Sequence, residues 1–271
     1  MLILIGTIIS LGASGLTYWG LGLFSKSPWY LFFLIVFVIS YFVLFLNVYW
    51  LIVLISIHKY RNIEYPGKVN KWNLLHIRLT ASFCLTLRGL LIRKKGFNNL
   101  PKEPSLIVFN HVSDYDPWVL YKVLKGRYAM VGKIALRNIP MVRSMASSVG
   151  TLYVNDNAPE KNREMIDRAV DYILNKDTSV CIAPEGTRNV SDNLAPFKHG
   201  GFHIALKSNC PIVLVGFRDM KKALNKKKMH FIHINVEVFD IIQKEEYQGK
   251  SAAELAQLCE DKYKKYLGYG E

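Results

Sequence analysis

The chain has 271 residues, of which 51% are hydrophobic, and it carries a formal net charge of +14. This length allows one sizeable core or two small ones, and the mean hydropathy of +0.13 is high for a soluble protein. No zinc-finger spacing, basic-region helix or aromatic RNA-binding signature accompanies the positive charge. We therefore expect anionic lipid headgroups, rather than nucleic acid, to face it.

Two uncharged apolar segments open the chain, at residues 1–24 and 29–57. A helix needs about 20 apolar residues to cross a bilayer, so both segments are long enough. The first lacks the basic start of a signal peptide and is followed at once by the second, which favours a two-helix membrane anchor over residues 1–60. His58 and Arg61 border the second segment, and positive flanks favour the cytosolic side of a cell membrane. A hairpin that dips into one leaflet is the alternative, and it leaves the rest of the chain on the same side.

Residues 70–95 combine apolar positions at helical spacing with six Lys and Arg residues. This composition, with Trp72 near one end, predicts an amphipathic helix that lies on the membrane surface. A core helix of the following domain is the alternative. Pro101 and Pro104 mark a linker, so we interpret residues 61–104 as an interfacial helix and a linker.

From residue 105 onward, short strand-like apolar runs alternate with longer runs of helical periodicity. This alternation predicts a layered α/β domain over residues 105–271. The expected strands are 106–109, 128–131, 151–154, 179–183, 212–217 and 229–239, and the expected helices are 116–125, 160–174 and 251–267.

Residues 110–116 follow the expected strand 106–109 and carry a histidine and a carboxylate. An imidazole titrates near neutrality, so His111 at a strand end is suited to proton transfer. Pro117 indicates that a helix starts at Asp116, and the preceding turn can curl this carboxylate back toward the histidine. The carboxylate would then fix the imidazole tautomer and stabilise its cation. A plain helix N-cap is the alternative role for Asp116.

Residues 180–188 leave another expected strand and end in a turn that contains Gly186, Thr187 and Arg188. A guanidinium offers fixed, bidentate donors to phosphate, and a hydroxyl and backbone N–H groups add more. A turn with a surface arginine is the alternative.

Together, the two segments resemble the glycerolipid acyltransferase family, and within it the 1-acylglycerol-3-phosphate acyltransferases. Residues 110–116 fit the family pattern N-H-x-S-x-x-D, and residues 184–188 read Pro-Glu-Gly-Thr-Arg. Three further blocks are matched in order, at residues 131–140, 196–202 and 211–215. The resemblance covers roughly residues 91–217.

The resemblance implies an acyltransferase domain with a central mixed sheet flanked by helices, preceded by a transmembrane helical hairpin. The implied reaction moves a fatty acyl group from acyl-CoA or acyl-carrier protein (acyl-ACP) to the free hydroxyl of lysophosphatidic acid. Its product is phosphatidic acid, a precursor of phospholipids. No cofactor and no metal are implied beyond the thioester co-substrate. The implied partners are the lysophospholipid acceptor, the thioester donor and a bilayer that contains anionic lipids.

In the implied mechanism, His111 is the general base toward the hydroxyl, and Asp116 orients and charges it. The hydroxyl oxygen attacks the thioester directly, so no acyl-enzyme forms and Ser113 is a local hydrogen-bonding group rather than a nucleophile. The substrate-binding residues implied by the resemblance are Asn110, Ser113, Lys133, Glu185, Gly186, Thr187 and Arg188.

The chain departs from the family pattern at Ala135, Arg143 and Asp156, where relatives often carry Glu, Gly and Arg. The acidic residue at 156 puts lysophosphatidic acid as the acceptor in doubt, so another lysophospholipid or a glycolipid is an alternative. Two other classes of function also stay open. One is a metal-dependent phosphohydrolase built on the histidine and aspartates of residues 110–116. The other is a catalytically silent lipid-binding protein.

Overall fold

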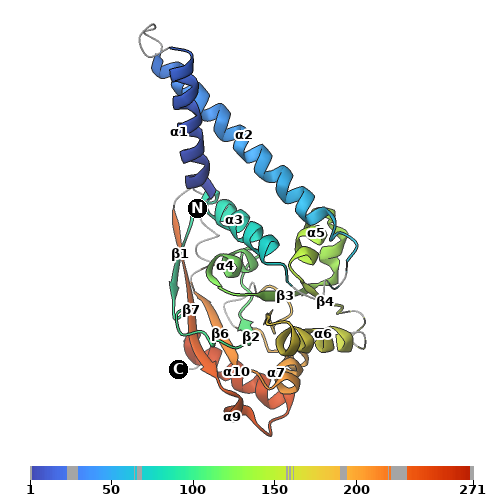
Figure 1. Ribbon diagram of the computed structural model, residues 1–271. Helices are drawn as coiled ribbons and strands as arrows, with labels where there is room; N and C mark the ends of the chain where they lie inside the picture. The colour runs from blue at the N-terminus through green and yellow to red at the C-terminus, as the bar shows by residue number, and fades with distance from the viewer. Residues whose placement is uncertain are drawn as a thin grey trace. The chain divides into compact units, whose positions relative to one another are not determined.

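The computed structural model describes residues 2–22, 30–63, 65, 69–156, 158, 160, 162–189, 194–218, 220 and 231–268. The chain forms two compact units, which divide between Lys59 and Tyr60. The first is a helical hairpin and the second is an α/β domain (Figure 1). The division follows the composition, because residues 1–57 contain a single lysine and no acidic residue.

The hairpin consists of α1 (Leu2–Gly20) and α2 (Tyr30–His58), which pack against each other. Gly6 permits a close approach, since a Cβ there would lie 2.8 Å from a phenylalanine ring of α2. The hydroxyls of Thr17 and Tyr41 form a hydrogen bond of 2.7 Å between the two helices. Small residues and polar pairs at the contact are typical of helices that associate in lipid.

One segment of the hairpin, Phe32–Ile55 in α2, is 24 residues long and apolar enough to cross a membrane. The apolar segment of α1, Leu4–Thr17, is shorter. At 1.5 Å per residue it is about 21 Å long, whereas the hydrocarbon core of a bilayer is about 30 Å thick. Helix α2 is therefore a candidate span, and the second span and the cytosolic orientation stay predictions.

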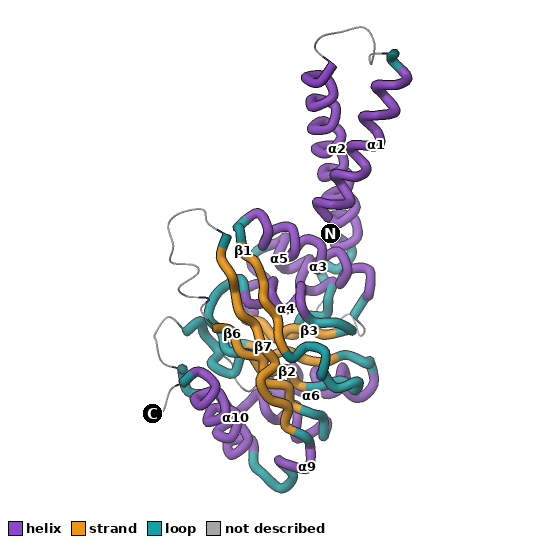
Figure 2. Tube along the Cα trace, turned by 90° about the vertical axis from the view of Figure 1, so that its left-hand side faces the viewer, coloured by secondary structure: helices purple, strands orange, loops and turns teal. Residues whose placement is uncertain are grey.

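The α/β domain is built on one seven-stranded sheet with the strand order β1-β7-β6-β2-β5-β3-β4. The strands are drawn in orange in Figure 2. All neighbouring strands are parallel except β6 and β7, which are antiparallel. This mixed sheet confirms the predicted fold class. The strands are β1 (Leu90–Lys95), β2 (Leu106–Phe109), β3 (Tyr128–Lys133), β4 (Leu152–Val154), β5 (Ser179–Ile182), β6 (Ile212–Arg218) and β7 (Ile232–Ile242).

Helices cover the sheet, and their packing follows from their apolar faces. Helix α3 packs on α4 and β1, α6 packs on α7 and β5, and α10 packs on β6. The helices are α3 (Lys71–Leu87), α4 (Asp116–Val123), α5 (Pro140–Ser148), α6 (Asn162–Asn175), α7 (His203–Ser208), α9 (Lys244–Tyr247) and α10 (Ala252–Leu267), with the 3-10 turns η2 (Ile134–Asn138) and η4 (His199–Phe202).

Strands β2 and β6 form the centre of the core, because they are apolar and buried along almost their whole length. Tyr263 of α10 is fully buried against them. Its hydroxyl lies 2.9 Å from the carbonyl oxygen of Val108 and 2.8 Å from that of Val215. Burial raises the pKa of Tyr263, so the hydroxyl keeps its proton for these carbonyls. Tyr263 thus holds β2 and β6 together, and the carboxyl ends of these two strands carry the candidate active site.

The predicted helix over residues 70–95 is wrong in its second half. Helix α3 ends at Leu87, and Gly89, with φ +68°, leads into β1, which pairs with β7. Glycine adopts this left-handed conformation without the strain of a Cβ, so the helix stops there. Apolar residues on both sides of the glycine conceal the change of period. The sheet therefore takes a strand from the segment 61–104, which was expected to hold only an interfacial helix and a linker.

Helix α3 agrees with the alternative interpretation, a core helix of the domain. Leu74, Ile77 and Leu85 are almost inaccessible to solvent, and the helix packs on α4 and β1. Its opposite face exposes Trp72. Contact between that outer face and a bilayer stays a prediction.

Candidate active site

The two segments that the sequence singles out meet at one edge of the sheet. Strands β2 and β5 are parallel neighbours, with Ile107 paired to Cys181. The residues that follow the two strands therefore leave the sheet at the same edge, where open α/β sheets bind their ligands. Two hydrogen bonds join the segments directly. The Asn189 N–H donates to the carbonyl of His111 at 2.8 Å, and the His111 N–H donates to Oε1 of Glu185 at 2.8 Å.

His111 and Asp116 form a close pair. The Nδ1 atom of His111 lies 2.8 Å from Oδ2 of Asp116. The same oxygen accepts the backbone N–H groups of Val112 at 2.7 Å and Ser113 at 2.9 Å, and the Ser113 hydroxyl donates to Oδ1 at 3.0 Å. The carboxylate is fully buried, and these donors leave it one orientation. The turn before α4 therefore holds the carboxylate against the imidazole.

This geometry sets the role of each ring nitrogen. With its Nδ1 proton donated to Asp116, the imidazole presents the Nε2 lone pair as a proton acceptor. The His111 side chain is 24% exposed, so a substrate hydroxyl can reach it. A buried carboxylate behind the ring stabilises the imidazolium that forms when Nε2 takes a proton. The pair therefore has the arrangement of a general base with its orienting group.

The alternative role for Asp116, a helix N-cap, does not fit the structure. The N-cap of α4 is Tyr115, which makes no capping hydrogen bond with its side chain. Asp116 is instead the first residue of the helix, followed by Pro117, and its carboxylate turns back over the preceding loop. Helix geometry alone would separate two side chains five residues apart, and the turn brings them together.

Asn110 joins two strands instead of facing the open site. Its Oδ1 accepts the backbone N–H of Phe217 at 2.8 Å, and its Nδ2 donates to the Phe217 carbonyl at 3.2 Å. The residue is buried. These contacts clamp the end of β2 to the end of β6 and give Asn110 a structural role, which differs from the expected contact with substrate.

Ser113 and Glu185 also position other groups. The Ser113 hydroxyl donates to Asp116 and accepts the Tyr115 N–H at 3.0 Å, so its capacity is used within the turn. Glu185 is buried, and its second oxygen, Oε2, accepts the Ala195 N–H at 3.4 Å. Burial raises the pKa of Glu185, and an acidic side chain is unsuited to hold a phosphate. Glu185 thus joins the two turns, and Ser113 stabilises its own turn, in place of the substrate contact expected for them.

Gly186 lets a lysine cross the turn after β5. Its φ is +68°, and a Cβ on it would lie 2.8 Å from Nζ of Lys198. The Lys198 N–H donates to the Pro184 carbonyl at 2.9 Å, which anchors the crossing segment. Lys198 is a candidate binding residue that the sequence reasoning missed. It lies in a family block, and its place beside Gly186 depends on the fold.

Three cations surround this turn, and each is paired with an acidic side chain. Nη1 of Arg188 lies 2.7 Å from Oδ2 of Asp114, and both side chains are largely exposed. Nζ of Lys133 lies 2.9 Å from Asp156, and Nζ of Lys198 lies 3.4 Å from the other oxygen of the same carboxylate. Hydrogen bonding from Lys133 and the charges of both lysines lower the pKa of Asp156. Exposed pairs of this kind are weak, so a phosphate can replace the carboxylates.

The position of Asp114 argues against the alternative of a metal-dependent phosphohydrolase. That reading needs the carboxylates of Asp114 and Asp116 to converge with His111 on one ion. Asp114 instead bonds Arg188, while Asp116 bonds the histidine. In the described part of the chain, no group of three His, Cys, Asp or Glu side chains has the geometry of a metal site.

An apolar fringe adjoins Lys133. The segment that follows β3 exposes four large apolar side chains to solvent, namely Ile134, Leu136, Ile139 and Met141. These side chains make the surface of this segment apolar beside the Lys133 cation.

Comparisons with known proteins match the part of the chain that contains this site. Residues 91–218 match the family model described as Acyltransferase. The chain is 27% identical over 172 residues to 1-acyl-sn-glycerol-3-phosphate acyltransferase alpha of Homo sapiens, an alignment that covers 63% of this chain and 58% of the relative. It is 28% identical over 155 residues to 1-acyl-sn-glycerol-3-phosphate acyltransferase of Escherichia coli K12, covering 57% and 63%. The aligned part thus spans about three fifths of the length of these relatives.

Among solved structures, the fold resembles that of the 1-acyl-sn-glycerophosphate (LPA) acyltransferase PlsC from Thermotoga maritima. The TM-score is 0.60 at 21% identity, over 72% of this chain and 78% of that one. At this identity the likeness concerns the fold. The segment that matches the family contains the sequence blocks described above. It also contains the paired His111 and Asp116. Residues 91–218 therefore resemble the acyltransferase family.

Proposed function

We propose that this protein is an O-acyltransferase that moves a fatty acyl group from a thioester to the free hydroxyl of lysophosphatidic acid, making phosphatidic acid. The observation that carries the proposal is the buried His111–Asp116 pair, joined by hydrogen bonds to a turn surrounded by cations. The names of the relatives support the same reaction.

The proposed chemistry needs one base and no covalent enzyme intermediate. Nε2 of His111 removes the proton of the acceptor hydroxyl while the hydroxyl oxygen attacks the thioester carbonyl carbon. The carbon–sulfur bond then breaks, and the imidazolium returns the proton to the leaving thiolate. Asp116 stabilises the imidazolium between these two steps. The thioester supplies the driving force, so acyl-CoA or acyl-ACP acts as a co-substrate and no further cofactor takes part.

The acceptor phosphate would bind over the turn after β5. Lys133, Lys198 and Arg188 offer three cationic groups there, and the Thr187 hydroxyl is exposed beside them. In this proposal, the phosphate exchanges with the carboxylates that pair with these cations, Asp156 and Asp114. The acidic residue at 156, a departure from relatives, then acts as a holder of two lysines that the substrate displaces.

The protein would meet its lipid substrates at a membrane. Helix α2 contains a segment long enough to span a bilayer, and the domain exposes an apolar fringe beside Lys133. The positive charge of the chain favours anionic headgroups near this surface. We therefore place the enzyme in the cell membrane, anchored by its hairpin, with its catalytic domain in the cytosol.

The test is an acyl transfer assay with purified full-length protein in detergent. Lysophosphatidic acid and radiolabelled acyl-CoA or acyl-ACP are supplied, and lipid product is measured for the wild type, His111→Ala and His203→Ala. His203 is an exposed histidine at the start of α7 and serves as the matched control. Product from the wild type and the control, with none from His111→Ala, is the expected result. Equal turnover by all three would remove His111 from the mechanism. Lipid binding without product in the wild type would favour a silent lipid-binding protein.

A further inference from the structure

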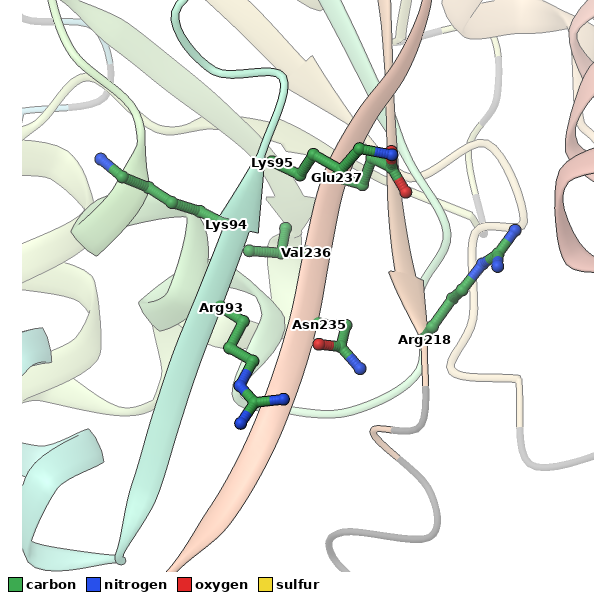
Figure 3. Close-up of a pocket in the computed structure, with 7 residues that line it drawn as sticks. All are labelled: Arg93, Lys94, Lys95, Arg218, Asn235, Val236 and Glu237. Carbon is green, nitrogen blue, oxygen red and sulfur yellow. The ribbon is translucent and has the colours of Figure 1, made fainter.

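A basic pocket lies on the half of the sheet that the candidate active site does not use. It has a volume of about 360 Å³ and is lined by residues of β1, β7 and β6, among them Arg93, Lys95, Asn235, Glu237 and Arg218 (Figure 3). This volume falls within the range of small-ligand sites, roughly 300–1,000 Å³. Nothing in the proposed mechanism employs these residues.

The register of the strands explains why these side chains share one face. Arg93 of β1 pairs with Asn235 of β7, and Asn235 pairs in turn with Arg218 of β6. Residues in register project to the same side of a sheet, and β1 and β6 are two strand spacings apart, about 10 Å. In the next row, Lys95 pairs with Glu237. Arg93, Asn235 and Arg218 therefore lie in one row across the three strands, and in Figure 3 the Arg218 guanidinium is directed away from Asn235.

The pocket is held in shape by its neighbours. The guanidinium of Arg218 lies 3.9 Å from the ring centre of Tyr266 and also donates to the carbonyl of that residue. The Tyr266 ring stacks on Phe239 at 4.1 Å and packs over Gly216, where any Cβ would overlap it. A stacked guanidinium keeps other N–H groups for a ligand. Tyr266 thus fixes one side of the Arg218 guanidinium, and the other side is open to a ligand.

The charge of this face is positive. Nζ of Lys95 is neutralised by Glu237 at 2.6 Å, whereas Arg93 forms no ion pair among the described residues. Three cations therefore face one carboxylate. An arginine pair beside an amide donor suits a phosphate ester, which accepts bidentate hydrogen bonds. Charged side chains on an edge strand such as β1 also prevent sheets from joining, so charge alone does not define a ligand. The fixed arginine, the amide between the arginines and the hollow that they line point to one.

The place of the pocket in the sheet identifies which phosphate it fits. Strand β2, which leads to His111, is the middle strand in the order β1-β7-β6-β2-β5-β3-β4. The cations of the turn after β5 and at the end of β3 lie on one side of it, and the basic pocket lies on the other. Strand β7, at the centre of the pocket, is two strand spacings from β2, roughly 10 Å. Arg218 directly follows Phe217, which Asn110 clamps next to His111, so β6 carries the pocket to the same edge as the catalytic pair.

We infer that this pocket binds the nucleotide phosphates of the acyl donor, acyl-CoA. The inference rests on the proposed function. The phosphate of a lysophosphatidic acid lies close to the hydroxyl that reacts, so it belongs beside His111, on the side of the β5 turn. In acyl-CoA, the pantetheine arm separates the thioester from the pyrophosphate and the ribose phosphate. These groups must bind away from the histidine, and the basic pocket is on the free side.

The first experiment is kinetic and uses the full-length enzyme with Arg93→Glu. Lys244→Glu, an exposed lysine of α9, makes the same change of charge outside the pocket and is the matched control. We expect Arg93→Glu to raise the KM for acyl-CoA roughly tenfold, the size expected for a lost charge-assisted contact. The KM for lysophosphatidic acid and the KM for an acyl-pantetheine thioester, which has no nucleotide phosphate, should not change. A rise in the KM for lysophosphatidic acid instead would assign the pocket to the acceptor headgroup and overturn the inference.

A second experiment separates this inference from the proposed function. Free CoA is titrated calorimetrically into the wild type, Arg93→Gln and Lys244→Glu, with inorganic phosphate as a competitor. Weaker CoA binding by Arg93→Gln alone supports the pocket even if no acyl transfer is found with any acceptor. Equal CoA affinity in all three proteins overturns it while leaving the acyl transfer assay untouched. Inhibition of acyl-ACP turnover by Arg93→Glu, with acyl-CoA turnover unchanged, would mean that the surface meets a carrier protein and would also overturn it. Thermal unfolding of each variant verifies that the fold is intact.

Discussion

Asp116 and Arg188 both belong to the candidate active site, but Asp116 is fully buried whereas the Arg188 side chain is 56% exposed. The carboxylate of Asp116 is fixed by donors from its own turn and by the imidazole. The guanidinium of Arg188 has one exposed acidic partner, Asp114. The two side chains therefore differ in how firmly the fold holds them. In the proposed mechanism, the pair that transfers the proton is in place before substrate binds, and the cations proposed to bind phosphate are held by exposed partners that a phosphate can replace.

The largest expected effect comes from breaking the buried pair with Asp116→Asn. Asn carries no negative charge to stabilise the imidazolium, and its NH2 group cannot accept the donors that the second carboxylate oxygen accepts now. We expect kcat to fall by about 10²- to 10⁴-fold, the range for general base catalysis. Steady-state assays measure this, with Asp261→Asn on the exposed face of α10 as the control. A kcat within a factor of about two of wild type would contradict the role of the pair.

Glu185→Gln tests whether the two turns depend on a buried carboxylate. Its oxygens accept N–H groups from His111 and Ala195, and the amide nitrogen of Gln would face one of these donors. Leaving a buried donor unsatisfied costs about 1–3 kcal/mol, so we expect a lower unfolding temperature and reduced kcat. Differential scanning calorimetry of the full-length protein at neutral pH measures the change, with the exposed Glu245→Gln as the control. A loss no larger than that of the control would contradict the bridging role.

The same carboxylate gives a pH dependence with a definite sign. Burial raises the pKa of Glu185 above its ordinary value of 4.5, so the folded state holds its proton to higher pH than the unfolded state does. The stability from this group is full below pH 4.5 and is lost as pH rises through the folded pKa. The unfolding free energy of the wild type relative to Glu185→Gln should therefore decline as pH rises from 4.5. A constant difference over this window would show that the folded pKa is ordinary.

Arg188→Ala acts on the exchangeable part of the site and should affect binding more than chemistry. We expect the KM for lysophosphatidic acid to rise roughly tenfold, because one phosphate contact is lost, with kcat changing less. Lysophospholipid and acyl-CoA titrations measure the two KM values separately. A larger change in the KM for the donor would place Arg188 with the acyl donor instead. Arg168→Ala, whose partner Glu164 is an exposed residue of the same helix, provides the control for removing an ion pair outside the turn.

Asp156→Asn should have the smallest effect, and in the opposite direction. The carboxylate holds Lys133 and Lys198, and an acceptor phosphate must displace it. Removing the competing charge should lower the KM for lysophosphatidic acid about two- to threefold, since exposed ion pairs are weak. The same titration measures this change. A rise in KM would mean that Asp156 positions the lysines for substrate rather than competing with it.

The sequence predicts the parts of the candidate site whose residues lie close together along the chain. His111 and Asp116 lie five positions apart, and Pro117 places the helix start, so their contact follows from one turn. The alternation of short strands with helices similarly predicts a layered α/β domain. These are local patterns, and the structure agrees with them.

What the sequence could not predict depends on contacts between distant segments. Asn110 pairs with the backbone of Phe217, and Lys198 crosses Gly186, neither of which any spacing reveals. Strand β1 was hidden because leucines recur on both sides of Arg88 and Gly89, so the change from helix to strand leaves no clear change in the apolar pattern. The order of strands in the sheet also depends on these long-range pairings. This strand order puts the basic pocket and the turn after β5 on opposite sides of His111.

Helix α10 follows every strand of the sheet along the chain, yet it braces the two central ones through Tyr263. A second contact runs from Glu260 to the N–H of Phe197, next to the lysine that crosses the β5 turn. During synthesis, a chain emerges from its N-terminal end and its segments fold in that order. The hairpin is therefore available for insertion long before α10 has been made. Under the proposed anchoring of the hairpin, insertion into the bilayer and assembly of the catalytic edge are thus separated in time.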